Sequence, residues 1–381
     1  MKGVELTAQE RRPRLLRVIT WLVAAFAACG AILFGRAKTG PSQPPPDLRS
    51  TGLYADFASK TVDGRNLPYS PQYPLWSDGA VKRRWVRIPP GTAIDASDPD
   101  VWTFPAGARL WKEFSFGGRR IETRMIESLE GGELRFATYV WNADESAALL
   151  APESGIKNAA EIRPGVKHDI PGVWDCRACH VGDKQEILGF SALQLSADRD
   201  PAAPHSEERS SGMVDLRFLI ERKLIGPHPK AWDGTPPRIE AASPAARAAL
   251  GYLHANCGNC HNLAGPLEAR GLIFRHSEKP GAAGGSAVTA SIGRPSHYPI
   301  PGAAPGTSFF IQPGDPDHSA VVYRMATRNP LRQMPPLGTK IVDDEAVSLI
   351  TRWIREDLGL KTSAAPAIDI NSHLQPKKEE P

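Results

Sequence analysis

Two short cysteine boxes carry the clearest chemistry in this sequence. One reads Cys176-Arg177-Ala178-Cys179-His180, and the other reads Cys257-Gly258-Asn259-Cys260-His261. The pattern C-x-x-C-H is typical of covalent haem attachment, in which two thiols form thioether bonds and the adjacent histidine binds the iron. Four of the chain's five cysteines lie in these boxes. The sequence therefore predicts two haem c groups, with thioethers at Cys176, Cys179, Cys257 and Cys260 and proximal iron ligands at His180 and His261.

Other chemistry for these thiols fits the sequence less well. The separation between Cys179 and Cys257 is far longer than the loop of a usual zinc module, and each histidine is adjacent to a cysteine. Nothing around either box has the strand and helix pattern of a thioredoxin-like redox site. Nucleotide-binding loops, serine nucleophile motifs and zincin helices are also missing from the sequence. A net charge of +4, from 46 basic and 42 acidic residues, does not indicate a nucleic-acid partner.

Helical patterns flank the second box. Ser243 and Pro244 supply an N-cap and a first helical residue, and the sequence from 245 to 255 then predicts a helix that runs into the box. A further helix is predicted over 318–327, with Asp317 as its cap. A last helix starts at Asp343, where acidic residues favour the helix dipole, and ends before a glycine.

Residues 245–358 resemble a class I cytochrome c in the order of entry helix, box, middle helix, methionine loop and closing helix. The resemblance implies a mainly α-helical cytochrome c domain over 243–360, with Met334 as the distal iron ligand of the second haem. Pro335 and Pro336 stiffen the loop that presents the thioether, while Met325 is the alternative ligand. The chain departs from this family at the entry helix, where the aromatic residue is Tyr252.

A wider resemblance covers most of the chain. Leu75 to Ala80, Glu122 to Arg124 and Tyr139 to Asn142, in this order before both boxes, are similar to a largely uncharacterised family of exported bacterial dihaem c-type proteins. The resemblance implies electron transfer, and it gives no substrate.

The distal ligand of the first haem stays open in the sequence, because no Met-Pro-Pro loop follows the first box. The candidates share a sulfur or imidazole donor, and Met213 is the one carried forward: Met213, His205, His168, His228 and Met125. An open iron position at the first haem would instead permit peroxidase-like chemistry.

A β-rich domain, either a sandwich or barrel-like, is predicted over 48–165. Strand patterns cover 81–88, 110–116, 121–128 and 134–141, and glycine pairs separate the last three. The aromatic loop before them contains Tyr73 and Trp76, which either plug one end of the sheet or line a haem edge.

Basic residues followed by an apolar run over 18–34 predict a signal peptide or signal anchor in 1–37. Cys29 also permits lipidation, although the apolar residues after it fit that poorly. A Pro-rich linker over 38–47 follows. We therefore expect the body of the protein in the periplasm, anchored to the inner membrane if the segment is retained.

Taken together, these patterns predict an α+β multidomain chain with a first haem-binding region at 166–242 and a disordered tail at 361–381. The expected function is a dihaem c-type cytochrome that passes single electrons between redox partners and is a carrier more than an enzyme. The alternatives are a haem oxidoreductase with an open first haem, or an electron-accepting subunit of an exported dehydrogenase. Expected partners are a periplasmic dehydrogenase or a terminal acceptor.

Overall fold

A computed structural model describes residues 43–180, 187–265, 267–279, 288 and 291–359. The chain from Pro44 onward forms one compact unit. The expected export segment, half of the linker and the expected disordered tail lie outside the described residues. Within the described ranges, no helix is both long and apolar enough to cross a membrane.

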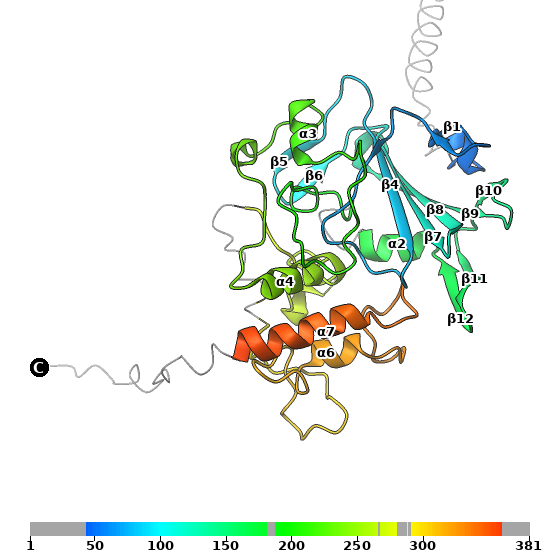
Figure 1. The fold of residues 1–381 in the computed structure, drawn as a ribbon. Helices are drawn as coiled ribbons and strands as arrows, with labels where there is room; N and C mark the ends of the chain where they lie inside the picture. Colours follow the sequence, from blue (N-terminus) through cyan, green and yellow to red (C-terminus); the bar gives the residue numbers. More distant parts are fainter. Residues whose placement is uncertain (1–42, 181–186, 266, 280–287, 289–290, 360–381) are drawn as a thin grey trace, which may run out of the picture. The chain divides into compact units, whose positions relative to one another are not determined.

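An antiparallel sheet of six strands, in the order β10-β9-β8-β7-β4-β3, is the centre of this unit (Figure 1). The predicted strand positions are confirmed, and Gly117 and Gly118 adopt the positive φ angles that the tight turn between β7 and β8 requires. The strands are β3 (Leu67–Pro68), β4 (Val81–Arg87), β7 (Arg109–Phe116), β8 (Arg119–Ser128), β9 (Leu134–Trp141) and β10 (Ala148–Leu150).

The expected sandwich or barrel is wrong, because this sheet is open and ends at β10 and β3. Irregular chain, in place of a second sheet, covers its two faces. Residues 48–57 pack against Trp85 and Trp111 on one face, and residues 187–232 pack against Val86 and Leu110 on the other. The remaining strands form two-stranded ribbons: β1 (Tyr54–Asp56) with β2 (Thr61–Val62), β5 (Asp95–Asp98) with β6 (Val101–Thr103), and β11 (Ile156–Arg163) with β12 (Val166–Ile170).

The expected mainly α-helical cytochrome c domain over 243–360 is also wrong. The described residues are β-rich and contain five short α-helices, of which the longest, α4, has 13 residues. Proline and glycine are frequent between α4 and α6, and most of the described chain there forms turns, isolated bridges and one 3-10 turn. The helical elements are α2 (Val173–His180), α3 (Leu216–Glu221), α4 (Pro244–Asn256), α6 (Ala320–Met325), α7 (Asp344–Arg352), the π-helix η5 (Trp353–Leu358) and the 3-10 turns η1 (Leu48–Thr51), η2 (Glu130–Gly132), η3 (Lys230–Asp233) and η4 (Glu268–Arg270).

Local signals placed α4 and α7 correctly. Ser243 Oγ accepts a hydrogen bond from the Ala246 amide at 3.0 Å, and Asp343 Oδ1 accepts one from the Ala346 amide at 3.1 Å. For α6 the expected cap was wrong, since Ser319 occupies that position. Helix α4 lies beside α7 (Figure 1), and Tyr252 and Trp353 share the core between α4 and η5.

Candidate haem-binding site

The second box continues directly from α4. The Cys257 amide donates to the Leu253 carbonyl at 2.9 Å, and the amides of Cys260 and His261 then donate to the Cys257 carbonyl at 3.1 and 2.9 Å. A side chain at Gly258 would put a Cβ atom 2.5 Å from the His254 carbonyl oxygen, so only glycine fits this turn. The helix therefore fixes where both thiols and the imidazole of this box lie.

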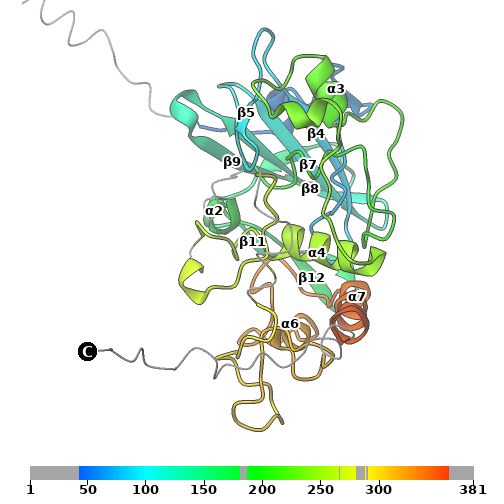
Figure 2. The ribbon, with the colours of Figure 1, turned by 90° about the vertical axis from the view of Figure 1, so that its left-hand side faces the viewer.

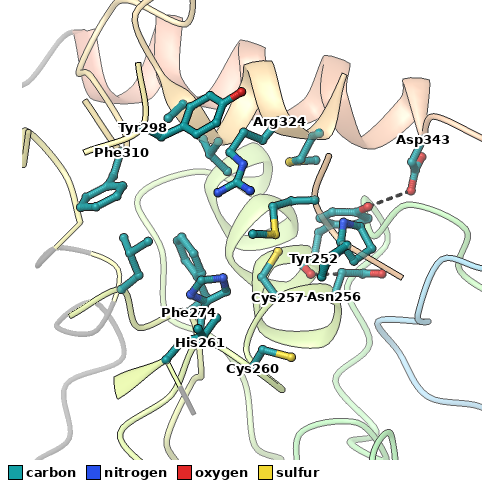
Figure 3. A pocket seen from close by; sticks show the side chains of 18 of the residues that line it. Tyr252, Asn256, Cys257, Cys260, His261, Phe274, Tyr298, Phe310, Arg324 and Asp343 are labelled. Carbon is teal, nitrogen blue, oxygen red and sulfur yellow. Dashed lines mark hydrogen bonds between the residues drawn. The ribbon is translucent and has the colours of Figure 1, made fainter. Parts of the chain in front are cut away.

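A cavity opens beside the second box, with about 1050 Å³ of empty space that includes a part open to solvent. Cys257, Cys260, His261 and Met334 all line it. Figure 3 shows Arg324 projecting from α6 toward the side of the cavity where His261 lies. The apolar part of the wall comes from Leu267, Leu272, Phe274, Phe310, Val321 and Pro335.

His261 has the form that a metal ligand needs. Its Nδ1 atom is buried and has no hydrogen-bond partner, and the Phe274 ring contacts the imidazole with centroids 5.4 Å apart. Burial, and then the charge of Arg324, lower the pKa of His261. A neutral imidazole is the form that binds metal ions.

Met334, which follows α6 in the sequence, lines the same cavity. Its amide donates to the Arg324 carbonyl at 2.9 Å, and Pro335 and Pro336, which follow it, also line the cavity. The alternative ligand Met325 lines the cavity as well, but it is buried in the core between α4 and α7. Two thiols, a neutral imidazole and a thioether around one apolar cavity fit a haem c group.

Within the described part of the chain, no group of three or more His, Cys, Asp or Glu side chains could hold a metal ion. Haem iron needs fewer side-chain ligands than a bare metal ion does, because side chains supply only its axial bonds.

The first box forms a helix, α2, which the sequence analysis did not predict. Asp175 Oδ2 accepts a hydrogen bond from the Gly172 amide at 2.9 Å, and the Cys176 amide donates to the Gly172 carbonyl at 3.1 Å. Helix α2 contacts β9 (Figure 2), where the rings of His180 and Phe136 have centroids 5.1 Å apart. The first histidine therefore faces the sheet.

The two boxes meet in the folded chain. The thiols of Cys179 and Cys260 lie close enough to interact, and this interaction raises the pKa of Cys179 and lowers the pKa of Cys260. All four box cysteines are free thiols and half-buried. Burial raises the pKa of Cys257 to about 12. The contact joins residues from distant parts of the sequence, and nothing in the spacing of the motifs indicates it.

Two of the distal candidates for the first haem are occupied by other contacts. His205 Nε2 lies 2.8 Å from Asp343 Oδ1, and its Nδ1 lies 3.3 Å from Glu345 Oε2. His168 Nε2 lies 2.9 Å from Glu122 Oε1. Both imidazoles are therefore held by carboxylates.

The other three candidates are a third histidine, which also contacts a carboxylate, and two methionines. Met125 is buried in the core around Trp111, on the sheet face away from Phe136. His228 Nε2 lies 2.9 Å from Asp233 Oδ1. Met213 precedes Val214, whose amide donates to the Pro68 carbonyl at 2.8 Å. Met213 as the distal ligand stays a prediction.

The aromatic loop joins the sheet to the second box. The Trp76 amide donates to Asn256 Oδ1 at 2.7 Å, its Nε1 donates to the Ile341 carbonyl at 3.1 Å, and its ring lines the cavity. Asp78 Oδ1 accepts hydrogen bonds from the amides of Lys340 and Ile341 at 2.8 and 2.9 Å. Tyr73 is buried and donates to Asp200 Oδ2 at 3.1 Å. The two aromatic residues thus have different positions, Trp76 at the cavity and Tyr73 in the core.

No family model, curated protein or solved structure matches this chain. The geometry of the boxes and the cavity is therefore the basis for a functional proposal.

Proposed function

We propose that this protein is a dihaem c-type protein that passes single electrons between redox partners outside the cytoplasm. The observation that supports it most is the contact between Cys179 and Cys260, since groups attached at the two boxes would be neighbours in one folded unit. Haem iron supplies one-electron redox chemistry. One electron enters from a donor protein and one leaves to an acceptor, so the chain itself is unchanged.

At the second box, His261 and Met334 would hold the iron of a haem bound there. His261 and Met334 line the same cavity, and with both as ligands no position is left for a substrate. A thioether opposite an imidazole raises the reduction potential. This arrangement favours electron transfer over chemistry on a bound molecule.

Exposed apolar residues lie near the boxes and near Met334. Trp174 is 78% exposed two residues before Cys176, and Leu263 is 69% exposed two residues after His261. Leu331 and Leu337 are also exposed, three residues to either side of Met334. Exposed apolar side chains around a buried redox group suit brief docking of a protein partner. The partners we propose are a periplasmic dehydrogenase and a terminal acceptor.

Export is proposed from the apolar run over 18–34, which lies outside the described residues. Haem attachment to C-x-x-C-H boxes takes place on the outer side of the bacterial membrane. The periplasm is therefore the proposed location, with the inner membrane as the anchor if the segment is retained.

Haem-stained denaturing electrophoresis and haem quantification test the proposal. Wild-type protein from a host competent in haem attachment should carry two haems per chain. Cys176→Ala with Cys179→Ala, or Cys257→Ala with Cys260→Ala, should leave one haem, and all four changes should leave none. A colourless wild-type protein from such a host would end the proposal.

Met334→Ala tests whether Met334 or Met325 is the distal ligand of the second haem. The change should remove the methionine-to-iron charge-transfer band and lower the reduction potential of the second haem, because a thioether ligand favours reduced iron. The matched variant Met325→Leu conserves apolar volume in the core and should keep the band. Loss of the band in Met325→Leu alone would assign the ligand to Met325 instead.

A second candidate function, haem oxidoreductase chemistry at the first box, is favoured by one observation. The imidazoles of His168 and His205 are held by carboxylates, which leaves the distal position without these two ligands. Low-temperature paramagnetic resonance decides between the two functions. A high-spin ferric signal from one haem supports the open position, and two low-spin signals contradict it.

A further inference from the structure

A row of cations crosses the sheet face that α2 covers. The strand register places Arg84 of β4 opposite Lys112 of β7, and Lys112 opposite Arg124 of β8. Lys82 lies two residues before Arg84 and therefore on the same face. Like charges directly opposite one another destabilise a sheet, so this arrangement needs a compensating anion.

Protein carboxylates satisfy this row only in part. Arg84 has a side chain 4% exposed, and its Nη1 lies 2.6 Å from Glu207 Oε2 while its Nη2 is buried without a hydrogen-bond partner. Lys112 Nζ lies 4.9 Å from the centre of the Phe114 ring. Among the described residues, no hydrogen bond or ion pair joins Lys112 to a carboxylate. Burial lowers the pKa of Lys112 well below its usual value.

Two carboxylates face the cations of this row. Glu207 pairs with Arg84, and the fully buried Glu122 pairs with Arg124 and also contacts His168. Lys82 Nζ donates to the Leu75 carbonyl at 2.9 Å, a neutral partner. Lys82 and Lys112 are thus left without a carboxylate. Buried charges of one sign are costly unless opposite charges compensate them.

The row lies next to the first box. The thiols of Cys176 and Cys179 are within electrostatic range of the Arg124 guanidinium. Ile126 lies two residues after Arg124 and therefore on the same face of β8. It is opposite Phe136 of β9, whose ring contacts His180. A group attached at this box would therefore lie over the sheet beside the unsatisfied cations.

We propose that Arg84, Lys112 and Arg124 form a carboxylate-binding row for a ligand at the first box. Guanidinium groups bind carboxylates with two parallel hydrogen bonds, and a lysine adds a point charge. Within this row, Lys112 and the unpartnered Nη2 of Arg84 are two donors that protein carboxylates leave unsatisfied, and they match a ligand with two carboxylates. One source is the pair of propionates of a haem at Cys176 and Cys179, which rests on the proposed function, and the other is a free dicarboxylate.

The first test compares Lys112→Met with Lys112→Arg in haem-loaded protein. The matched control is Lys167→Met, a change at an exposed lysine of β12. Lys112→Met should lower the midpoint potential of the first haem and leave the second unchanged, because loss of a nearby cation disfavours the reduced state. Lys112→Arg should restore the wild-type value. Equal potentials in all four proteins would overturn the propionate source.

The second test uses the full chain with Cys176→Ala and Cys179→Ala, so that the first box carries no haem. Succinate should raise its thermal unfolding midpoint saturably, and adding Lys112→Met should abolish that response. Without succinate, Lys112→Met should itself raise the midpoint of this protein, because it removes a half-buried lysine that has no carboxylate partner. Haem-loaded wild type should not respond to succinate.

The outcomes separate the two sources from each other and from the proposed function. A saturable succinate response of haem-loaded wild type that Lys112→Met abolishes assigns the row to a free dicarboxylate. No succinate response in any of these proteins, with unchanged potentials, overturns the row as a carboxylate site. A chain that never stains for haem contradicts the proposed function, whereas its succinate response still tests the row.

Discussion

The same five-residue motif lies in two contrasting environments in this protein. The second box follows α4 into an apolar cavity, where His261 is neutral and has a buried nitrogen without a partner. The first box forms α2 and lies against a sheet face that carries Arg84, Lys112 and Arg124. In the proposed function the motif would provide the attachment points, while the elements around it determine the charge and polarity that a bound group would meet. Two haems held in this way should differ in reduction potential.

The largest expected effect tests the charged environment of the first box. Glu122→Ala removes the fully buried carboxylate that Arg124 and His168 share and leaves the half-buried Arg124 guanidinium unpaired. We expect the free energy of unfolding to fall by about 3–5 kcal/mol, the usual result of breaking a buried ion pair. Urea denaturation followed by circular dichroism measures it.

Glu130→Ala, in the exposed turn η2, is the control for this change. It should alter the free energy of unfolding by no more than about 0.5 kcal/mol. Equal stability of the Glu122→Ala protein and the wild type would mean that the charges near the first box are compensated without Glu122.

The next effect concerns the packing that fixes the second box. A Cβ atom at residue 251 of α4 would lie 2.0 Å from Tyr73 Cε1. We expect Gly251→Ala to cost about 1–3 kcal/mol of unfolding free energy, since overpacking displaces a buried side chain. Gly234→Ala, where a Cβ atom would meet nothing within 4 Å, is the control, and a cost in both proteins would remove the contact with Tyr73 as the cause.

The third effect is an acid response on the side of the second box. Burial, and then the charge of His276, lower the pKa of His254 to about 3, and its Nδ1 accepts a hydrogen bond from the His276 amide at 3.1 Å. Between the unfolded pKa of about 6.5 and the folded value, the unfolded chain binds a proton that the folded chain does not. Stability should therefore fall as the pH falls through this window, by about 1.4 kcal/mol per pH unit from this group.

His254→Gln, which keeps a hydrogen-bond acceptor, should flatten this part of the stability profile, and it should change nothing above pH 7. The exposed His297→Gln is the control. Urea midpoints measured between pH 4 and pH 8 compare the three proteins, and parallel profiles for wild type and His254→Gln would contradict the prediction.

Local signals in the sequence predicted local structure well. The glycine pair at 117 and 118 marked the turn between β7 and β8, and Ser243 with Pro244 marked the start of α4. These residues act within a few positions of themselves, through positive φ angles and a capping hydrogen bond. Met334 was implied by the resemblance to class I cytochrome c, and it lines the same cavity as His261.

Tertiary arrangement was not predictable in this way. The order of helix, box and methionine loop indicated a helical domain, but the order of motifs does not determine how the chain between them folds, and proline-rich turns occupy it instead. The contact of Cys179 with Cys260 depends on how distant segments pack. Lys112 and Arg124 show no special pattern along the chain, because strand register alone makes them neighbours.

The loop at Trp76 and Asp78 has a consequence for the order of events during synthesis. Its hydrogen bonds to Asn256, Ile341 and Lys340 join residues separated by 180, 265 and 262 positions. Closing such long loops is entropically costly, and contacts of this range form slowly. The second box therefore cannot reach its final surroundings until the chain has emerged almost to its last helix. During that interval its thiols stay accessible, so that in the proposed function a haem would be attached to them before the cavity closes.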